Sequence, residues 1–169
     1  ISAPISETPK DGKGASASAL VSNSGTISST GGTILLTARA ARSVENNVIN
    51  NTGVIEANSV SMHNGEVTLD AGPDGTVNAG GTIPAAGRDT GQTGGAIAVT
   101  GGTVNVSDDA TLDASGASGG GTVEIGGGLH GQGAIANAQT TIVGKATINA
   151  DAVTKGNGGT VAVWSDSNT

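Results

Sequence analysis

Short runs of alternating apolar and polar residues follow one another along this chain from Leu20 onward. Each run places two apolar side chains two residues apart, such as Ile34 with Leu36 or Val123 with Ile125. Because successive residues of a β-strand point to opposite faces, each pair lies on one face of a short strand. Gly, Asn and Asp stand between the runs, where turns need a positive φ or a bond from a short polar side chain. The pattern therefore predicts an all-β chain of many short strands.

Two phrases recur among these strands. A glycine pair opens a β-branched run at residues 31–36, 94–99, 120–125 and 158–163. A second phrase at 110–115 returns at 146–151, with looser copies at 25–29 and 53–57. Strands that recur every few tens of residues are typical of a solenoid, in which each coil buries its apolar face on the next. We predict a right-handed parallel β-helix of about five to seven coils over residues 20–169, preceded by a linker or entering arm at 1–19.

The alternating apolar residues also define a predicted core. It consists of Ile34, Leu36, Val67, Leu69, Ile97, Val99, Val104, Val106, Leu112, Val123, Ile125, Ile148, Val161 and Val163. We expect three departures from regular strands: a short helical turn at 38–44, a surface loop at 79–95 and an insertion near 127–140.

Composition narrows the class of protein. With 30 glycines, one Trp and no Phe or Tyr, the interior must be thin and filled by small aliphatic side chains. The formal net charge of -7 argues against nucleic acid or an anionic membrane surface as a partner, because both require clustered Lys or Arg. Without cysteine there is neither a disulfide nor a thiolate zinc site. No apolar run approaches the length of a membrane span, so we expect no membrane insertion.

Three segments imitate ligand-binding motifs. Residues 126–131 fit the glycine pattern of dinucleotide-binding loops, but the ten residues that follow are a poor helix, so a simple turn is favoured. Residues 70–75 imitate the start of a calcium-binding loop, yet Gly72 and Gly81 stand where oxygen ligands belong, which favours a turn between strands. Weak binding of a calcium ion by Asp108 and Asp109 stays an alternative. We predict no cofactor and no metal site.

Because parallel β-helices include polysaccharide lyases and hydrolases, catalysis must also be weighed. Glycoside hydrolysis needs carboxylates that converge on one sugar, and Asp108, His130 and Asp151 fall in the wrong order for the pectin-cleaving sets. His63 and His130 have no Ser or carboxylate partner at motif spacing. We predict that the chain is not an enzyme. Trp164 is a candidate for stacking against a sugar ring, but we favour a structural role in which it covers the rim of a neighbouring coil.

Four segments, taken in order, resemble one protein family. They are residues 37–41, 48–57, 113–127 and 156–166, the last of which contains the lone Trp164. Together they resemble the filamentous-haemagglutinin-like large exoproteins of Gram-negative bacteria, in the region just after the family's N-terminal secretion domain. The resemblance implies a parallel β-helix that is exported by two-partner secretion, with an outer-membrane transporter as partner during export. It also implies a secreted protein, extracellular or at the cell surface.

From these observations we expect a structural role. The chain would be a rigid β-helical stalk segment of a surface adhesin or extracellular filament that serves cell adhesion. The alternative is a β-helix protein that binds or degrades carbohydrate, with host or neighbouring-cell glycans as partners. A strand-like, Trp-bearing coil close to the end of the chain also predicts head-to-tail self-association.

Overall fold

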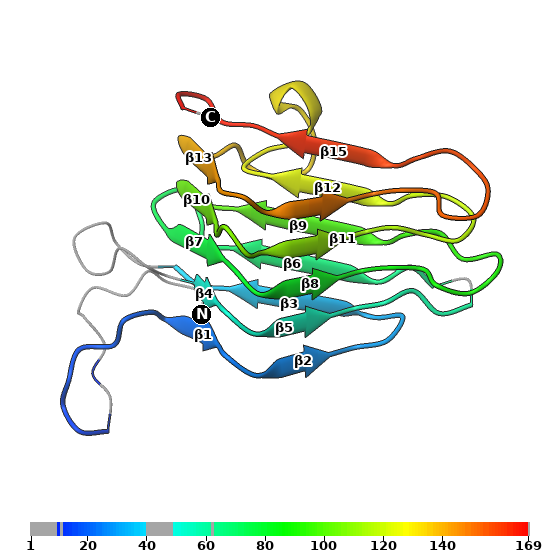
Figure 1. The fold of residues 1–169 in the computed structure, drawn as a ribbon. Helices are drawn as coiled ribbons and strands as arrows, with labels where there is room; N and C mark the ends of the chain where they lie inside the picture. The colour runs from blue at the N-terminus through cyan, green and yellow to red at the C-terminus, as the bar shows by residue number, and fades with distance from the viewer. Residues whose placement is uncertain (1–9, 11, 40–48, 62, 169) are drawn as a thin grey trace.

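The computed structural model describes residues 10, 12–39, 49–61 and 63–168 of the chain. Its strands form three parallel sheets of five strands each (Figure 1). The first sheet contains β1 (Val21–Asn23), β4 (Ile49–Asn51), β7 (Thr76–Ala79), β10 (Thr103–Val106) and β13 (Thr140–Val143). The second contains β2 (Thr26–Ser28), β5 (Val54–Glu56), β8 (Thr82–Pro84), β11 (Thr111–Asp113) and β14 (Thr147–Asn149). The third contains β3 (Thr33–Thr37), β6 (Glu66–Asp70), β9 (Ala96–Thr100), β12 (Thr122–Ile125) and β15 (Thr160–Val163).

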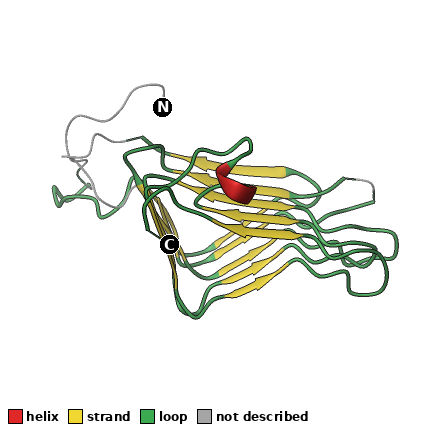
Figure 2. Ribbon diagram, turned by 90° about the horizontal axis from the view of Figure 1, so that it is seen from above, coloured by secondary structure: helices red, strands yellow, loops and turns green. Residues whose placement is uncertain are grey.

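Each successive group of three strands makes one coil, and the coils are numbered 1 to 5 here from β1–β3 to β13–β15. Every pairing between neighbouring coils is parallel, with the same register from coil to coil; Val123 of β12, for example, lies between Ile97 of β9 and Val161 of β15. In Figure 1 the chain rises coil by coil from blue to red, and Figure 2 looks down the stack onto the three sheets. The right-handed parallel β-helix predicted from the sequence is confirmed.

The two sequence phrases correspond to two of the sheets. All four glycine-pair phrases lead into strands of the third sheet, β3, β9, β12 and β15. The second phrase and its looser copies form strands of the second sheet, β11, β14, β2 and β5. Repetition in the sequence therefore reflects position within a coil, because equivalent residues stack on one another along the solenoid axis.

The predicted core is largely correct, with one error at the end of the stack. Ten of its residues are buried, while Leu36, Ile148 and Val163 are only partly buried and pack against the core. Val161 is 44% exposed, so its assignment to the core was wrong. Its register with Val123 does point it inward, but no described coil lies above β15 to cover it.

The core also contains residues that the alternation did not predict. Ile49, Ile55, Val77 and Ile83 are fully buried, each in a strand of three or four residues that carries few other apolar side chains. Alanines directly after three strands of the second sheet are also fully buried: Ala57 after β5, Ala85 after β8 and Ala114 after β11. The alternation did not predict them, because each lies just beyond the end of its short strand.

The predicted surface loop at 79–95 was wrong in its first half. Residues 82–84 are strand β8, and Ala85, Ala86 and Gly87 after it are buried. Pro84 suggested a loop because proline cannot donate a backbone hydrogen bond within a sheet. The structure accommodates it by shortening one pairing: β5 and β8 share the single register pair Val54–Thr82, while the Pro84 carbonyl accepts a hydrogen bond from the Ala57 amide at 2.9 Å.

Two other expectations have different outcomes. The insertion is confirmed, because residues 126–139 separate β12 from β13, whereas Gly101 and Gly102 alone separate β9 from β10. The helical turn predicted at 38–44 falls mostly on residues 40–44, which lie outside the described part of the chain. The boundary between an arm at 1–19 and the solenoid stays a prediction.

A buried pair of asparagines joins the lower coils at the corner between the first and second sheets. The Asn23 side-chain amide donates to the Asn51 side-chain oxygen at 2.8 Å, and Asn51 in turn donates to the Gly80 carbonyl at 2.6 Å. Coils 1, 2 and 3 are thus connected by side-chain hydrogen bonds in addition to their backbone ladders.

We expect Asn51→Ala to lower the free energy of unfolding by about 1–3 kcal/mol, because it removes the shorter bond of the Asn23 amide, which keeps only its 3.2 Å bond to the Val54 carbonyl, and it removes the side-chain donor to the buried Gly80 carbonyl. Urea denaturation followed by far-UV circular dichroism measures the change. Asn105→Ala is the matched control, since Asn105 donates to Asn78 at 3.0 Å from a half-buried position on the strand face opposite to Val104 and Val106. Its loss should be about 0.2–1 kcal/mol. An equal effect of the two substitutions would contradict the role given to the buried pair.

Candidate functional surfaces

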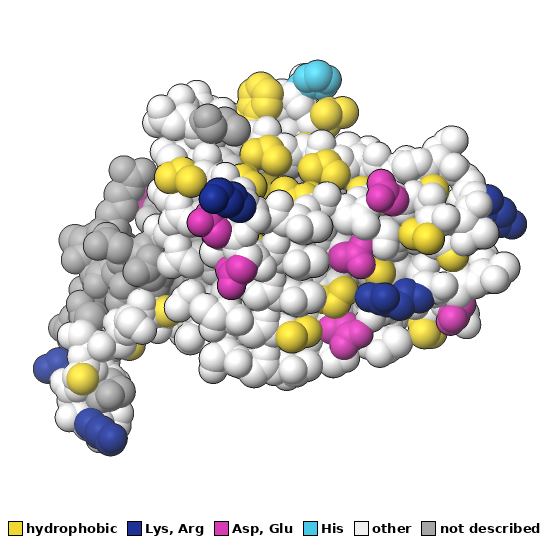
Figure 3. Space-filling model, in the orientation of Figure 1, with side chains coloured by type: hydrophobic (Ala, Val, Ile, Leu, Met, Phe, Trp, Pro, Cys, Tyr) yellow, Lys and Arg dark blue, Asp and Glu magenta, His cyan; other side chains and the backbone are white. Residues whose placement is uncertain are grey.

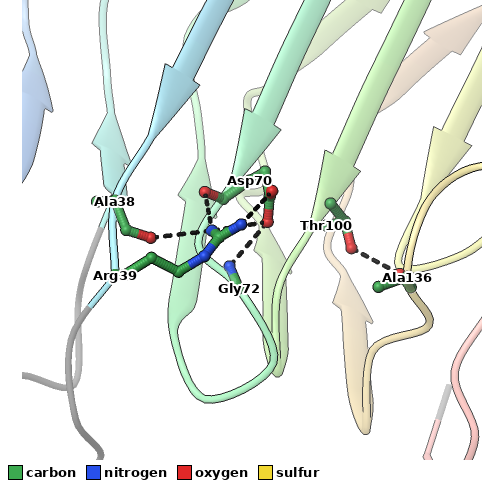
Figure 4. Close-up of polar contacts among 6 residues, drawn as sticks. All are labelled: Ala38, Arg39, Asp70, Gly72, Thr100 and Ala136. Atoms are coloured by element: carbon green, nitrogen blue, oxygen red, sulfur yellow. Dashed lines mark hydrogen bonds and ion pairs between the residues drawn. The ribbon is translucent and has the colours of Figure 1, made fainter. Parts of the chain in front are cut away.

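The insertion at residues 126–139 is the largest departure from the regular coils. It contains one turn of 3₁₀ helix, η1 (Leu129–Gly131), which contacts β15 and is the coiled segment in Figure 2. The Ala138 amide donates to the Gly126 carbonyl at 2.7 Å and closes its base. The Thr100 hydroxyl donates to the Ala136 carbonyl at 2.6 Å and fixes the insertion to the end of β9 (Figure 4). The insertion is therefore held by specific bonds, while Leu129 and His130 at its tip are exposed.

Trp164 packs against this insertion. It follows β15, and its side chain is half-buried. The backbone of Gly131 approaches the indole so closely that a Cβ there would lie 2.7 Å from the ring. The indole N–H donates to Asp166 at 3.2 Å, and the Thr141 hydroxyl donates to the Trp164 carbonyl at 2.7 Å. These contacts agree with the structural role favoured for Trp164, which covers the insertion of the preceding coil.

The glycine motif at 126–131 does not open an α-helix. Its last three residues form η1, His130 has a φ of 58°, and Gln132 after it is extended. A dinucleotide-binding loop needs a helix N-terminus at this point to meet the pyrophosphate. The segment instead forms the first half of the insertion, which fits the turn that the sequence favours.

The acidic motifs take part in hydrogen bonds at the corners of the coils. Asp70 ends β6 and forms a two-pronged ion pair with Arg39, whose nitrogens lie 2.8 and 3.1 Å from its two carboxylate oxygens; it also accepts the Gly72 amide at 2.8 Å (Figure 4). Asp108 accepts the Lys145 amide of coil 5 at 3.1 Å, and Asp109 accepts the Ser107 hydroxyl at 3.1 Å. Both motifs thus stabilise turns, as short polar side chains commonly do.

The two histidines lie in different connections. His63 exchanges two backbone hydrogen bonds with Val60 in the connection between β5 and β6, whereas His130 lies in the insertion between β12 and β13. Both side chains are exposed. Within the residues that the structure covers, no three His, Asp or Glu side chains gather closely enough to hold a metal ion.

A shallow groove of about 420 Å³ runs along the entrance to the third sheet. It is lined by residues 64–66, 93–96 and 120–122, so its floor is mainly glycine backbone. Glu66 is the one ionisable side chain in this lining. Acid–base cleavage of a glycosidic bond uses two carboxyl groups, and this groove therefore offers one of the two.

In the described part of the chain no helix has the length and apolar character needed to cross a membrane.

Comparison with known proteins gives a match among the solved structures. The chain matches no protein-family model, and no curated protein matches it. Its fold is similar to the crystal structure of the HMW1 secretion domain from Haemophilus influenzae, with a TM-score of 0.57 and 29% sequence identity. The similarity covers 77% of this chain and 33% of that one, so the chain spans about a third of that structure's length.

This likeness bears on the sequence resemblance in two ways. It supports, at a coarse level only, the resemblance to large bacterial exoproteins that the four ordered phrases indicate. The phrases point to the region that follows such a domain, whereas the structural likeness is to a secretion domain itself. The sequence predicted the insertion and singled out Trp164, but it did not predict the residues that anchor them. These are Thr100 and Asn137, whose side-chain amide donates to the Gly131 carbonyl at 3.1 Å and to Asp166 at 3.0 Å. Neither residue belongs to a repeated phrase.

Proposed function

We propose that this chain is a structural segment of a secreted adhesin of a Gram-negative bacterium, and that it supplies length and rigidity at the cell surface. The observation that carries the proposal is the likeness to the HMW1 secretion domain at 29% identity, taken together with the four ordered phrases. The chain would belong to the filamentous-haemagglutinin-like exoproteins and leave the cell through an outer-membrane transporter by two-partner secretion.

The distribution of residue types supports a stalk. Nearly every repeated residue has a place in the coil geometry: β-branched side chains fill the core, and glycine pairs lead into the third sheet. Each coil contacts its two neighbours through parallel ladders, so added coils extend the rod without changing its width. A rod of this kind holds whatever it carries at a fixed distance from the membrane.

Protease treatment of intact cells tests the proposal. In the bacterium that produces the protein, an antibody against this segment should bind unpermeabilised cells, and added proteinase K should abolish the signal. Deleting the outer-membrane transporter should leave the antigen inside the cell. A periplasmic control protein should survive the same treatment. Antigen that resists the protease until the cells are lysed would contradict surface display.

A second candidate function is carbohydrate binding by the insertion. The observation in its favour is that a well-anchored loop presents Leu129 and His130 beside the half-buried Trp164. A glycan array probed with the wild-type chain and with Leu129→Ser distinguishes a binding module from a bare stalk. Incubation with acidic and neutral polysaccharides addresses turnover: sustained release of reducing ends or unsaturated products would favour an enzyme.

A further inference from the structure

The groove at the entrance to the third sheet lies in the middle of the solenoid. Its lining comes from coils 2, 3 and 4, at the residues that lead into β6, β9 and β12. Coil 1 lies below these coils and coil 5 lies above them, so neighbouring coils fix the groove on both sides. Its volume of about 420 Å³ is sufficient for a small molecule or a short piece of a polymer.

A notch in this groove results from one small side chain in a column of larger ones. On the outer face of the third sheet, Glu66, Ala96 and Thr122 occupy the same register position in successive coils. Neighbouring strands are about 4.8 Å apart, so the strands that carry Glu66 and Thr122 are about 10 Å apart with only a methyl group between them. This space is wide enough for one pyranose ring of a sugar.

The backbone that forms the floor of the groove is already paired within the solenoid. The Gly95 amide donates to the Ala85 carbonyl at 2.7 Å, and the Gly95 carbonyl accepts the Thr122 amide at 2.9 Å. The Gly121 amide donates to the Ala114 carbonyl at 2.8 Å. A peptide that adds to a sheet as a further strand needs unpaired amide and carbonyl groups at an edge. A ligand in this groove must therefore be recognised by side chains.

Polar side chains on both sides of the groove have hydrogen-bonding capacity to spare. On the side of the turns, the Thr93 hydroxyl donates to the Asn64 side-chain oxygen at 3.1 Å, which leaves the Asn64 amide nitrogen as a donor. On the side of the strands, the exposed Glu66 carboxylate forms no hydrogen bond or ion pair with any residue that the structure describes. Thr122 adds a half-buried hydroxyl that can both donate and accept.

The charge of the lining favours a neutral ligand. Glu66 is its one ionisable side chain, and the whole chain has a formal net charge of -7. Over the coils drawn in Figure 3, Lys and Arg side chains stand singly among acidic ones. An anionic ligand would therefore be repelled. Sugar hydroxyl groups fit the lining, because they donate to a carboxylate and accept from an amide or a hydroxyl.

We propose that this groove binds a neutral oligosaccharide, with one sugar ring in the notch over Ala96. Glu66 accepts hydrogen bonds from hydroxyl groups of this ring, Asn64 donates to it from the opposite side, and Thr122 contacts the next ring along the solenoid axis. With one carboxyl group in its lining, the groove binds the sugar without cleaving it. This binding goes beyond the stalk function and is independent of it, because the purified chain binds the sugar wherever the cell places the protein.

Saturation-transfer NMR on the purified 169-residue chain tests the proposal. The neutral probes are cellobiose, maltose, lactose and diacetylchitobiose at millimolar concentration, with digalacturonic acid as the anionic probe and spermidine as the cationic probe. At least one neutral disaccharide should bind, and its affinity should not change with ionic strength, because no pair of opposite charges forms. Failure of all four neutral probes, or binding confined to digalacturonic acid or to spermidine, would overturn the proposal.

Three substitutions locate the bound sugar. Glu66→Gln should weaken binding about tenfold, because a hydrogen bond to a charged acceptor becomes one to a neutral acceptor. Ala96→Ile should abolish binding, because its side chain fills the notch. Ala98→Ile is the matched control: it makes the same change on the same face of β9, outside the lining of the groove, and should bind like the wild type.

Melting temperatures show which of these variants fold, and Glu66→Gln, at an exposed position, provides the test even if Ala96→Ile does not fold. Full binding by Glu66→Gln or by folded Ala96→Ile would overturn the proposal. Loss of binding in folded Ala98→Ile would do the same, since it would place the sugar elsewhere on the sheet.

Discussion

Val123→Asp should prevent stable folding of the solenoid or lower its free energy of unfolding by about 4 kcal/mol or more. Val123 is fully buried in β12, between Ile97 of coil 3 and Val161 of coil 5. A carboxylate at this place would have no cationic partner among its register neighbours and no access to water. Urea denaturation, or the loss of the far-UV β signal if the variant does not fold, measures the effect.

Val161→Asp is the matched control for this prediction. Val161 lies in the same inward-facing row, one coil further along, and it is 44% exposed. A carboxylate there reaches solvent, so the cost should be about 1 kcal/mol or less in the monomer. Equal losses of stability in the two variants would show that position in the row, rather than a covering coil, decides burial. They would refute the explanation given above for the exposure of Val161.

The difference between these two valines also shows why the sequence predicts the fold better than it predicts where the buried core ends. The glycine-pair phrase is the same at 120–125 and at 158–163, and it correctly indicates two strands of one sheet. Burial, however, depends on whether a coil lies above the strand. That is a property of the stack, and no phrase within a single coil encodes it.

Short strands and prolines account for the other errors. A strand of three residues such as β4 or β8 offers too few positions for alternation to be recognised. Pro84 indicated a loop by a rule that holds for hydrogen-bonded positions, but shortening the pairing of β8 with β5 was enough to keep it in the sheet. Neither error affected the fold class, because the remaining strands determine the topology.

The candidate surfaces were predicted only in outline. An insertion follows from the unequal spacing of the glycine-pair phrases, so its place near 127–140 could be predicted. Its conformation could not, because the bonds that fix it join Thr100 to Ala136 and Asn137 to Asp166, and these residues are brought together by the stacking of coils. The Asn23–Asn51 bond was missed for the same reason.

Gly120→Ala should destabilise the protein by several kcal/mol. The added Cβ would lie 1.9 Å from the Ala150 carbonyl oxygen and 2.3 Å from the Gly159 nitrogen, two backbone atoms of coil 5 that cannot move without breaking the bond between them. Relief requires coils 4 and 5 to separate locally, which also disrupts the pairing of β12 with β15. We therefore expect a loss of about 3–5 kcal/mol, measured by urea denaturation.

The same substitution one coil further along, at Gly158, separates the steric effect of a neighbouring coil from the conformational preference of glycine itself. Gly158→Ala introduces the same methyl group into the same turn, but its nearest atom is 4.0 Å away. Since alanine also loses less conformational entropy on folding than glycine, the monomer should be unchanged or more stable by about 0.5–1 kcal/mol. A large loss in both variants would mean that the turn itself requires glycine. A loss confined to Gly120→Ala would mean that the requirement comes from the coil above.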